Sequence, residues 1–127
     1  MSGEAVGFAM ETLLAAGALD VYTVPIGMKK SRPGIMLTCM CRAEQRDEML
    51  RLLFRHTTTL GVREYDCARY TLHRSVRTEE SACGPVRVKS AEGWGVKREK
   101  PEYEDLARIA RERGISLREA AEEMQMT

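Results

Sequence analysis

Apolar and polar residues recur along the chain with two periods, one typical of helices and one typical of strands. An apolar stripe that begins at Val6 predicts a first helix, with Ser2 as its cap and Gly17 as its stop. Alternation then predicts two strands, over residues 19–24 and 35–41. This part of the chain therefore predicts one helix followed by two strands.

The rest of the chain continues the same mixture of patterns. Residues 43–54 predict a second amphipathic helix, with acids early and arginines late, as the helix dipole favours. Residues 62–72 alternate imperfectly, which predicts a long strand with a bulge or bend. The shorter elements predicted after it are strands at 76–78, 86–89 and 96–98, a helix at 101–113 that stops at Gly114, and a helix at 116–126 that begins with a capping box.

The order of these elements predicts an α+β fold. One strand placed before Ser2 would turn helix, strand, strand, helix, strand into a ferredoxin-like split βαββαβ unit. We therefore expect a ferredoxin-like subdomain that lacks its first strand over residues 1–72. Residues 73–127 are expected to form a small α+β subdomain with a C-terminal helical hairpin. The absent strand would be central, so its empty position would leave backbone groups unpaired.

Composition places few further limits on the protein. The chain has 127 residues, of which 43% are hydrophobic and 31% are charged, and these fractions indicate neither disorder nor a membrane span. Its formal net charge of +1 gives no general attraction to nucleic acid or acidic membranes. None of the four cysteines forms a CxxC pair. Cys39 and Cys41 share one face of a predicted strand, which favours buried thiols over a disulfide framework or a zinc or nickel thiolate site. With no secretory segment in the pattern, we expect a cytoplasmic protein.

Residues 25–34 hold three cations and no acid between glycines and prolines. They predict an exposed hairpin loop, either an anion clamp or an ordinary solvated tip. The topology brings this loop to the end of the sheet where the first helix begins and the second helix finishes. Charge and hydroxyl donors there predict a phosphate-binding rim, although the C-terminal end of the second helix repels anions. The rim consists of Lys29, Lys30, Arg32, Arg55, Thr57, Thr58, Thr59 and Arg63.

Five motifs in a fixed order resemble the nickel-insertion family known as LarC. They occupy residues 17–21, 25–34, 55–63, 84–89 and 100–105, and together they cover nearly the whole chain. Only the C-terminal portion of that family is represented. The resemblance implies a nickel chelatase (cyclometallase) of the lyase class, which acts in nickel-pincer cofactor biosynthesis and so in lactate racemase maturation.

The resemblance also implies the substrates and cofactors. Family members insert Ni²⁺ into pyridinium-3,5-bisthiocarboxylic acid mononucleotide while CTP is converted to CMP, with Mg²⁺ or Mn²⁺ assisting. Both organic substrates are phosphorylated, so we assign the rim residues to nucleotide binding. Asp20 and Asp105 are candidate ligands for the divalent metal, one acid from each subunit of an oligomer, and each also has an ordinary reading as a turn or first-turn residue.

The chain departs from the family at its beginning. Family members carry an acidic strand ahead of the first helix and an N-terminal portion with His-rich segments, whereas this sequence begins at Met1. His56 replaces the usual acid in its motif, and Leu106 follows Asp105 where a cysteine is common. The chain is then either the second polypeptide of a split reading frame, completed by an N-terminal polypeptide, or a truncated gene product. We expect a partner strand, a homo-oligomer or a rearranged sheet.

Two functions of other classes fit parts of the sequence. The two C-terminal helices around Gly114 have the spacing of a helix-turn-helix, but the second helix carries Glu119, Glu122 and Glu123, so no nucleic-acid partner is expected, and no membrane partner either. A regulatory module that binds a small ligand or nucleotide without catalysis stays open. Trp94, between two glycines, is interpreted as a turn residue, with base stacking as the alternative.

Overall fold

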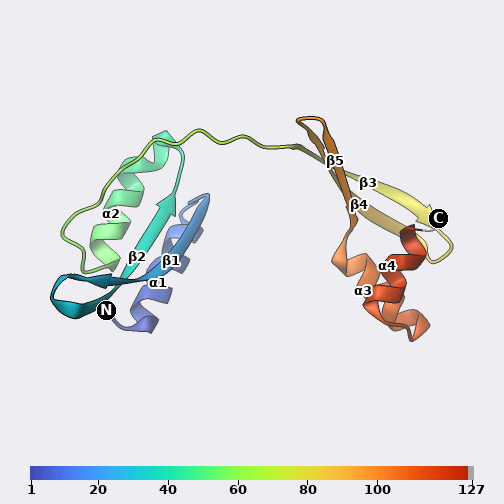
Figure 1. The fold of residues 1–127 in the computed structure, drawn as a ribbon, viewed down its shortest axis with the longest axis horizontal. Coiled ribbons are helices and arrows are strands. Elements are labelled where there is room, and N and C mark those ends of the chain that lie inside the picture. Colours follow the sequence, from blue (N-terminus) through green and yellow to red (C-terminus); the bar gives the residue numbers. More distant parts are fainter. Residues whose placement is uncertain (126–127) are drawn as a thin grey trace. The chain divides into compact units, whose positions relative to one another are not determined.

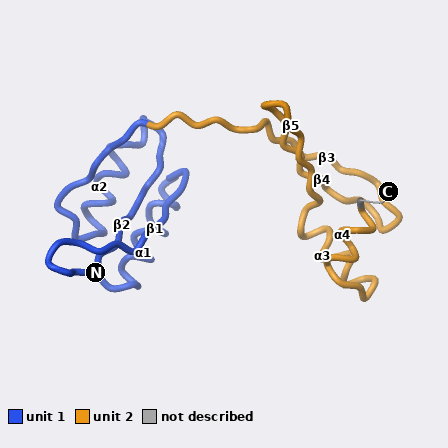
Figure 2. Tube along the Cα trace, in the orientation of Figure 1, with its two compact units in different colours: residues 1–66 blue, residues 67–127 orange. Residues whose placement is uncertain are grey.

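The computed structural model describes residues 1–125. The chain divides into two compact units, unit 1 over Met1–Asp66 and unit 2 over Cys67–Thr127, and each has its own hydrophobic core (Figure 2). The boundary between the units lies earlier than the one expected after residue 72. Four helices and two small antiparallel sheets make up the described residues, so the predicted α+β class is confirmed.

Unit 1 is a β-hairpin with two helices (Figure 1). Its short 3-10 turns, η1 and η2, precede β2 and α2. Ser2 caps the first helix as predicted, because its Oγ accepts a hydrogen bond of 3.1 Å from the backbone N–H of Ala5. The elements are α1 (Gly3–Ala15), β1 (Asp20–Met28), η1 (Lys29–Ser31), β2 (Arg32–Met40), η2 (Ala43–Gln45) and α2 (Arg46–His56).

The core of unit 1 lies between the hairpin and the helices. Leu13 of α1, Val21 of β1, and Met49 and Leu53 of α2 are its buried members. Cys39 and Cys41 pack against this cluster as free thiols, as the alternation in the sequence predicts. Burial, with a smaller contribution from Cys41, raises the pKa of the Cys39 thiol, so this thiol is a packing group at neutral pH.

The predicted strand over residues 62–72 is wrong. These residues are extended but belong to no sheet. In a split βαββαβ sheet the last strand pairs with the central first strand, and none of the described residues fills that central position. A strand needs a neighbour for its ladder of hydrogen bonds, and without one the extended backbone is left to water.

Unit 2 is a three-stranded antiparallel sheet in the order β3-β4-β5, followed by a helical hairpin. The predicted short strands and the two helices are confirmed, and the strands run longer than the sequence pattern indicated. The last residue predicted for the final helix, Met126, lies outside the described residues. The elements are β3 (His73–Ser81), β4 (Gly84–Gly93), β5 (Val96–Pro101), α3 (Tyr103–Arg113) and α4 (Leu117–Gln125).

The helical hairpin covers one face of this sheet. Val86 of β4 is buried against Leu106 and Ile109 of α3 and Ala120 of α4. Gly114 ends α3 in the left-handed conformation, with φ of 67°. The predicted capping box is present in α4, because Ser116 and Glu119 exchange backbone-to-side-chain hydrogen bonds. Among the helices of residues 1–125, none has the length and apolar character that a membrane crossing needs.

Candidate phosphate-binding site

The basic loop forms the tip of the β1–β2 hairpin. Lys29, Lys30 and Ser31 make the turn, with Lys30 and Ser31 in the left-handed region at φ of 63° and 56°. Arg32 opens β2 directly after the turn. The three cations are exposed, and within residues 1–125 none of them has an ion-pair partner. Their charge is therefore available to an anionic ligand.

The hydroxyl-rich loop after α2 is held by its own side chains. The Thr57 hydroxyl donates a 2.6 Å hydrogen bond to the carbonyl of Leu53, and the Thr59 hydroxyl donates a 2.8 Å bond to the carbonyl of Gly61. Thr58 instead uses its backbone N–H, which donates to the sulfur of Met1 at 3.4 Å. Of the three threonines, Thr58 alone keeps a hydroxyl free of internal hydrogen bonds in the described structure. Thr57 and Thr59 shape the loop, and Thr58 is the one positioned to donate outward.

The two loops and the start of α1 meet at one end of unit 1. The Thr58–Met1 contact joins the end of α2 to the start of α1, and the rings of Phe8 and His56 lie 5.5 Å apart between the same two helices. Because β1 runs antiparallel to α1 and α2 runs antiparallel to β2, the hairpin tip lies at this end too (Figure 1). Arg55, in the last turn of α2, adds a fourth cation.

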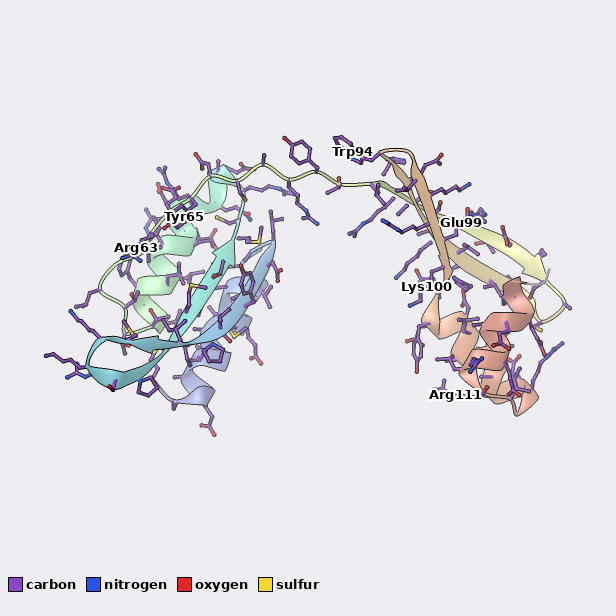
Figure 3. The ribbon with its side chains drawn as sticks, in the orientation of Figure 1. Arg63, Tyr65, Trp94, Glu99, Lys100 and Arg111 are labelled. Carbon is purple, nitrogen blue, oxygen red and sulfur yellow. The ribbon has the colours of Figure 1, made fainter. Side chains whose placement is uncertain are left out.

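Arg63 is the predicted rim residue that does not join the others. The chain turns back along α2 after the threonine loop, and the neighbouring Glu64 lies 3.9 Å from Arg46, the first residue of α2. Arg63, one residue before Glu64, therefore lies in the segment that returns along α2 and not in the loop at the rim (Figure 1). Figure 3 shows Arg63 alongside α2. The sequence placed it at the rim only because residues 62–72 were predicted to start a strand there.

The two candidate metal ligands are differently placed. Asp20 begins β1, is exposed, and accepts a 2.9 Å hydrogen bond from the N–H of Val21. Asp105, in the first turn of α3, is engaged by Arg87 through both of its oxygens, at 2.7 Å to the backbone N and at 3.1 and 3.2 Å to the guanidinium. These side-chain and backbone hydrogen bonds hold the pKa of Asp105 below its usual range. A metal at Asp105 would have to displace Arg87.

No three His, Cys, Asp or Glu side chains gather within residues 1–125 in a way that could hold a metal ion.

Sequence reasoning missed one feature of unit 2. Cations at alternate positions of neighbouring strands share one face of its sheet, and Arg98 and Lys100 show the required spacing of two in the sequence. The strand register that brings Arg74 beside them cannot be read from the sequence.

The chain combines a β-hairpin and two helices in unit 1 with a three-stranded sheet and a helical hairpin in unit 2. Known proteins share this arrangement of elements. A sequence profile described as nickel insertion protein matches residues 1–121. The chain belongs to this family of nickel insertion proteins, which confirms the family resemblance.

Individual relatives agree with this assignment. A relative from Geobacter sulfurreducens is 48% identical over 118 residues, covering 93% of this chain and 30% of the relative. The pyridinium-3,5-bisthiocarboxylic acid mononucleotide nickel insertion protein of Alkaliphilus metalliredigens is 40% identical over 126 residues, covering 99% of this chain and 30% of that protein. The chain therefore spans about a third of the length of these relatives.

A solved structure is similar to nearly the whole chain. It is the apo form of LarC2, the C-terminal domain of a cyclometallase involved in the synthesis of the NPN cofactor of lactate racemase. The similarity has a TM-score of 0.81 at 35% sequence identity, and covers 98% of this chain and 87% of that one. The part of the family that this chain represents is thus a separately solved C-terminal domain.

Proposed function

We propose that this chain is the C-terminal part of a CTP-dependent nickel insertase, which places nickel into the pincer nucleotide cofactor of lactate racemase as CTP is converted to CMP. The similarity to the C-terminal domain of a cyclometallase carries this proposal. The cationic hairpin tip supports the nucleotide part of it, because its three unpaired cations suit a triphosphate. Nickel is the substrate of the reaction, not a resident cofactor.

The residues of the rim would bind and orient the nucleotide. Lys29, Lys30 and Arg32 contribute charge from the hairpin tip, Arg55 contributes charge from the end of α2, and Thr58 contributes a hydroxyl donor. The start of α1 adds the positive end of its dipole at the same place, which offsets the negative end of α2. Mg²⁺ or Mn²⁺, when bound with CTP, would neutralise charge on the phosphates. Its ligands on this chain stay a prediction. Asp20 begins β1 at the end of the hairpin opposite the tip, about 27 Å away along the strand, so it cannot reach a metal held on those phosphates within one chain.

The decisive experiment follows CMP release. The chain is incubated with CTP, Mn²⁺, Ni²⁺ and nickel-free pincer precursor, alone and together with the N-terminal polypeptide of the same system. CMP that appears only when precursor and Ni²⁺ are both present is the expected result. CTP binding without any CMP under either condition would instead favour the regulatory module.

Replacing Lys29 and Arg32 together with alanine is expected to weaken CTP binding by about tenfold or more, because each cation removed deprives a phosphate of a charge-assisted contact. Isothermal titration calorimetry with CTP and Mn²⁺ measures this. Arg51→Ala, which removes an exposed cation from the middle of α2, is the matched control and should bind CTP like the unaltered chain. Equal affinity of the double variant and the control would remove the rim from the nucleotide site.

We also propose that unit 1 completes its sheet through a partner, as the ferredoxin-like arrangement requires. Residues 62–72 belong to no sheet, and the hairpin face turned away from the core exposes Tyr22, Val24, Met28 and Met36. An exposed apolar face of this kind is typical of an interface. Light scattering is expected to show a homo-oligomer, or a complex once the N-terminal polypeptide is added. A monomer in both samples would count against the proposal.

All four cysteines are free thiols, in keeping with a reducing cytoplasm.

A further inference from the structure

The sheet of unit 2 has one strongly basic face. Ala91 of β4 pairs with Arg74 of β3 and with Arg98 of β5, and one alternation step further on Lys89 pairs with Val76 and Lys100. Paired residues point to the same side of an antiparallel sheet, and so do residues two apart along a strand. We call the side that includes Ala91 the basic face. Its cations are Arg74, Arg87, Lys89, Arg98 and Lys100.

Three of these five cations have no internal partner. Arg87 lies 3.1 Å from Asp105, and the Lys89 ammonium lies 3.2 Å from Glu102. Arg74, Arg98 and Lys100 form no ion pair with any residue that the structure describes, and all three are exposed. Because Ala91 is small, the space above it between Arg74 and Arg98 is open to an anion.

The other face of the same sheet is the internal comparison. There α3 and α4 cover Val86, and the cations that remain outside that cover are neutralised: Arg77 and Lys97 lie 2.8 and 3.2 Å from Glu99. Unpaired positive charge on this sheet is therefore confined to the basic face. The cations of the covered side are neutralised, whereas three cations of the basic face are not, and this leaves a positive potential there that favours an anion.

An aromatic hollow lies at the end of the sheet nearest Arg98. Trp94 forms the β4–β5 turn with φ of 52°, and its indole N–H donates a 3.3 Å hydrogen bond to the carbonyl of Thr71. The ring of Tyr70 stands at 87° to the indole, with centroids 5.7 Å apart. Leu72 completes the lining. Trp94 and Tyr70 are 73% and 77% exposed, so their rings are open to a ligand. Figure 3 shows Trp94 at the tip of the hairpin and Lys100 farther along β5.

The distance between the hollow and the unpaired cations matches the distance between the ring and the phosphate of a mononucleotide. Gly93 and Val96, the last pair before the turn, lie two residues from Ala91 and Arg98, or about 7 Å along the strands. A planar ring in the hollow would thus direct a phosphate carried on its ribose over Ala91, between Arg74 and Arg98. The residues that line the hollow include no cation, and its aromatic rings attract a positively charged ring.

We propose that the basic face and the aromatic hollow bind a pyridinium mononucleotide, with the cationic ring against Trp94 and Tyr70 and the phosphate between Arg74 and Arg98. This inference rests on the proposed function, since the substrate named for the Alkaliphilus metalliredigens relative is a pyridinium mononucleotide. It assigns the second phosphorylated substrate to unit 2 and leaves CTP to the rim of unit 1. Lys100 lies two residues beyond Arg98 on the same face of β5, and its charge adds to the attraction for the phosphate.

Trp94 is the only tryptophan in the chain, so its fluorescence reports this site directly. Nicotinic acid mononucleotide serves as the pyridinium probe, and saturable quenching of Trp94 fluorescence is expected. Replacing Arg74 and Arg98 together with alanine should weaken its binding by about tenfold or more, because both phosphate contacts are lost. Lys97→Ala, on the same strand but on the opposite face, is the matched control and should leave binding unchanged. Far-UV circular dichroism of each variant confirms the fold, and the single Arg98→Ala variant gives an intermediate loss.

Three results would overturn the inference. They are equal binding by the double variant and the control, quenching by CMP as strong as by the pyridinium probe, and tighter binding of a thymidine oligonucleotide than of either mononucleotide. The test is separable from that of the proposed function. Probe binding that survives Lys29→Ala with Arg32→Ala, in a chain that releases no CMP, would keep the basic-face site and reject turnover. CMP release with no probe binding would do the reverse.

Discussion

Replacing Ile109 with alanine is expected to lower the free energy of unfolding of unit 2 by about 2–5 kcal/mol. Ile109 is 1% exposed and packs with Val86, Leu106 and Ala120 in the core of that unit. A unit of this size buries a modest fraction of its surface and has little stability to spare. We therefore expect the variant to leave unit 2 largely unfolded at room temperature.

The single tryptophan makes this effect measurable in the whole chain. Trp94 belongs to unit 2, so urea unfolding followed by its fluorescence reports unit 2 alone. Ile109→Val, which removes one methylene, should lower the free energy of unfolding by about 0.5–1.5 kcal/mol and keep the transition visible. The control is Leu117→Ala, because Leu117 is 43% exposed on α4 and its loss should change little. An unchanged midpoint for Ile109→Ala would mean that the core lies elsewhere.

Replacing Asp105 with alanine is expected to lower the free energy of unfolding of unit 2 by about 1–3 kcal/mol. The Asp105 side chain is 15% exposed and accepts hydrogen bonds from the backbone N–H and the guanidinium of Arg87. These bonds join α3 to β4 just past the last pair of β4 with β5, and nothing else in the described structure satisfies that backbone N–H. Glu104→Ala, one residue earlier in the same helical turn, is the matched control.

The same contact gives unit 2 a pH dependence. The pKa of Asp105 is lower in the folded chain than its ordinary value of about 3.9, so its contribution is present above that value and is lost as the pH falls through the folded pKa. Stability measured by Trp94 fluorescence should fall between about pH 5 and pH 2, and less steeply in Asp105→Asn. Glu99 and Glu119 also have lowered pKa values, so the difference between the two chains isolates Asp105. Identical slopes would show that Asp105 is not a stabilising ion.

Local patterns predicted the elements well where a helix or strand finds its partners nearby. The cap at Ser2, the stop at Gly114 and the Cys39–Cys41 alternation were all visible in the sequence, because each depends on neighbours within a few residues. Residues 62–72 failed for the opposite reason. Their alternation favours a strand, but a strand exists only beside another, and no periodicity tells whether the neighbour is present.

The candidate site was predictable in composition and less so in chemistry. Lys29, Lys30 and Arg32 were identified as a cationic tip, and the structure leaves them unpaired. The sequence could not show that the hydroxyls of Thr57 and Thr59 donate hydrogen bonds to backbone carbonyls. Nor could it show that both carboxylate oxygens of Asp105 accept hydrogen bonds from Arg87. A sequence shows which residue types are present. Whether the donor or acceptor atoms of a side chain are free to bind a ligand depends on the fold around it.

At Lys30, which lies in the left-handed turn, the residue that would be best for the stability of unit 1 differs from the residue that would be best for binding a phosphate. A side chain in that conformation costs roughly 1–2 kcal/mol relative to glycine, which adopts it freely. An engineer seeking a more robust unit 1 would choose Lys30→Gly, and would thereby remove one of the three cations of the tip. Optimising this hairpin as a scaffold and optimising it as a phosphate receptor therefore call for different residues.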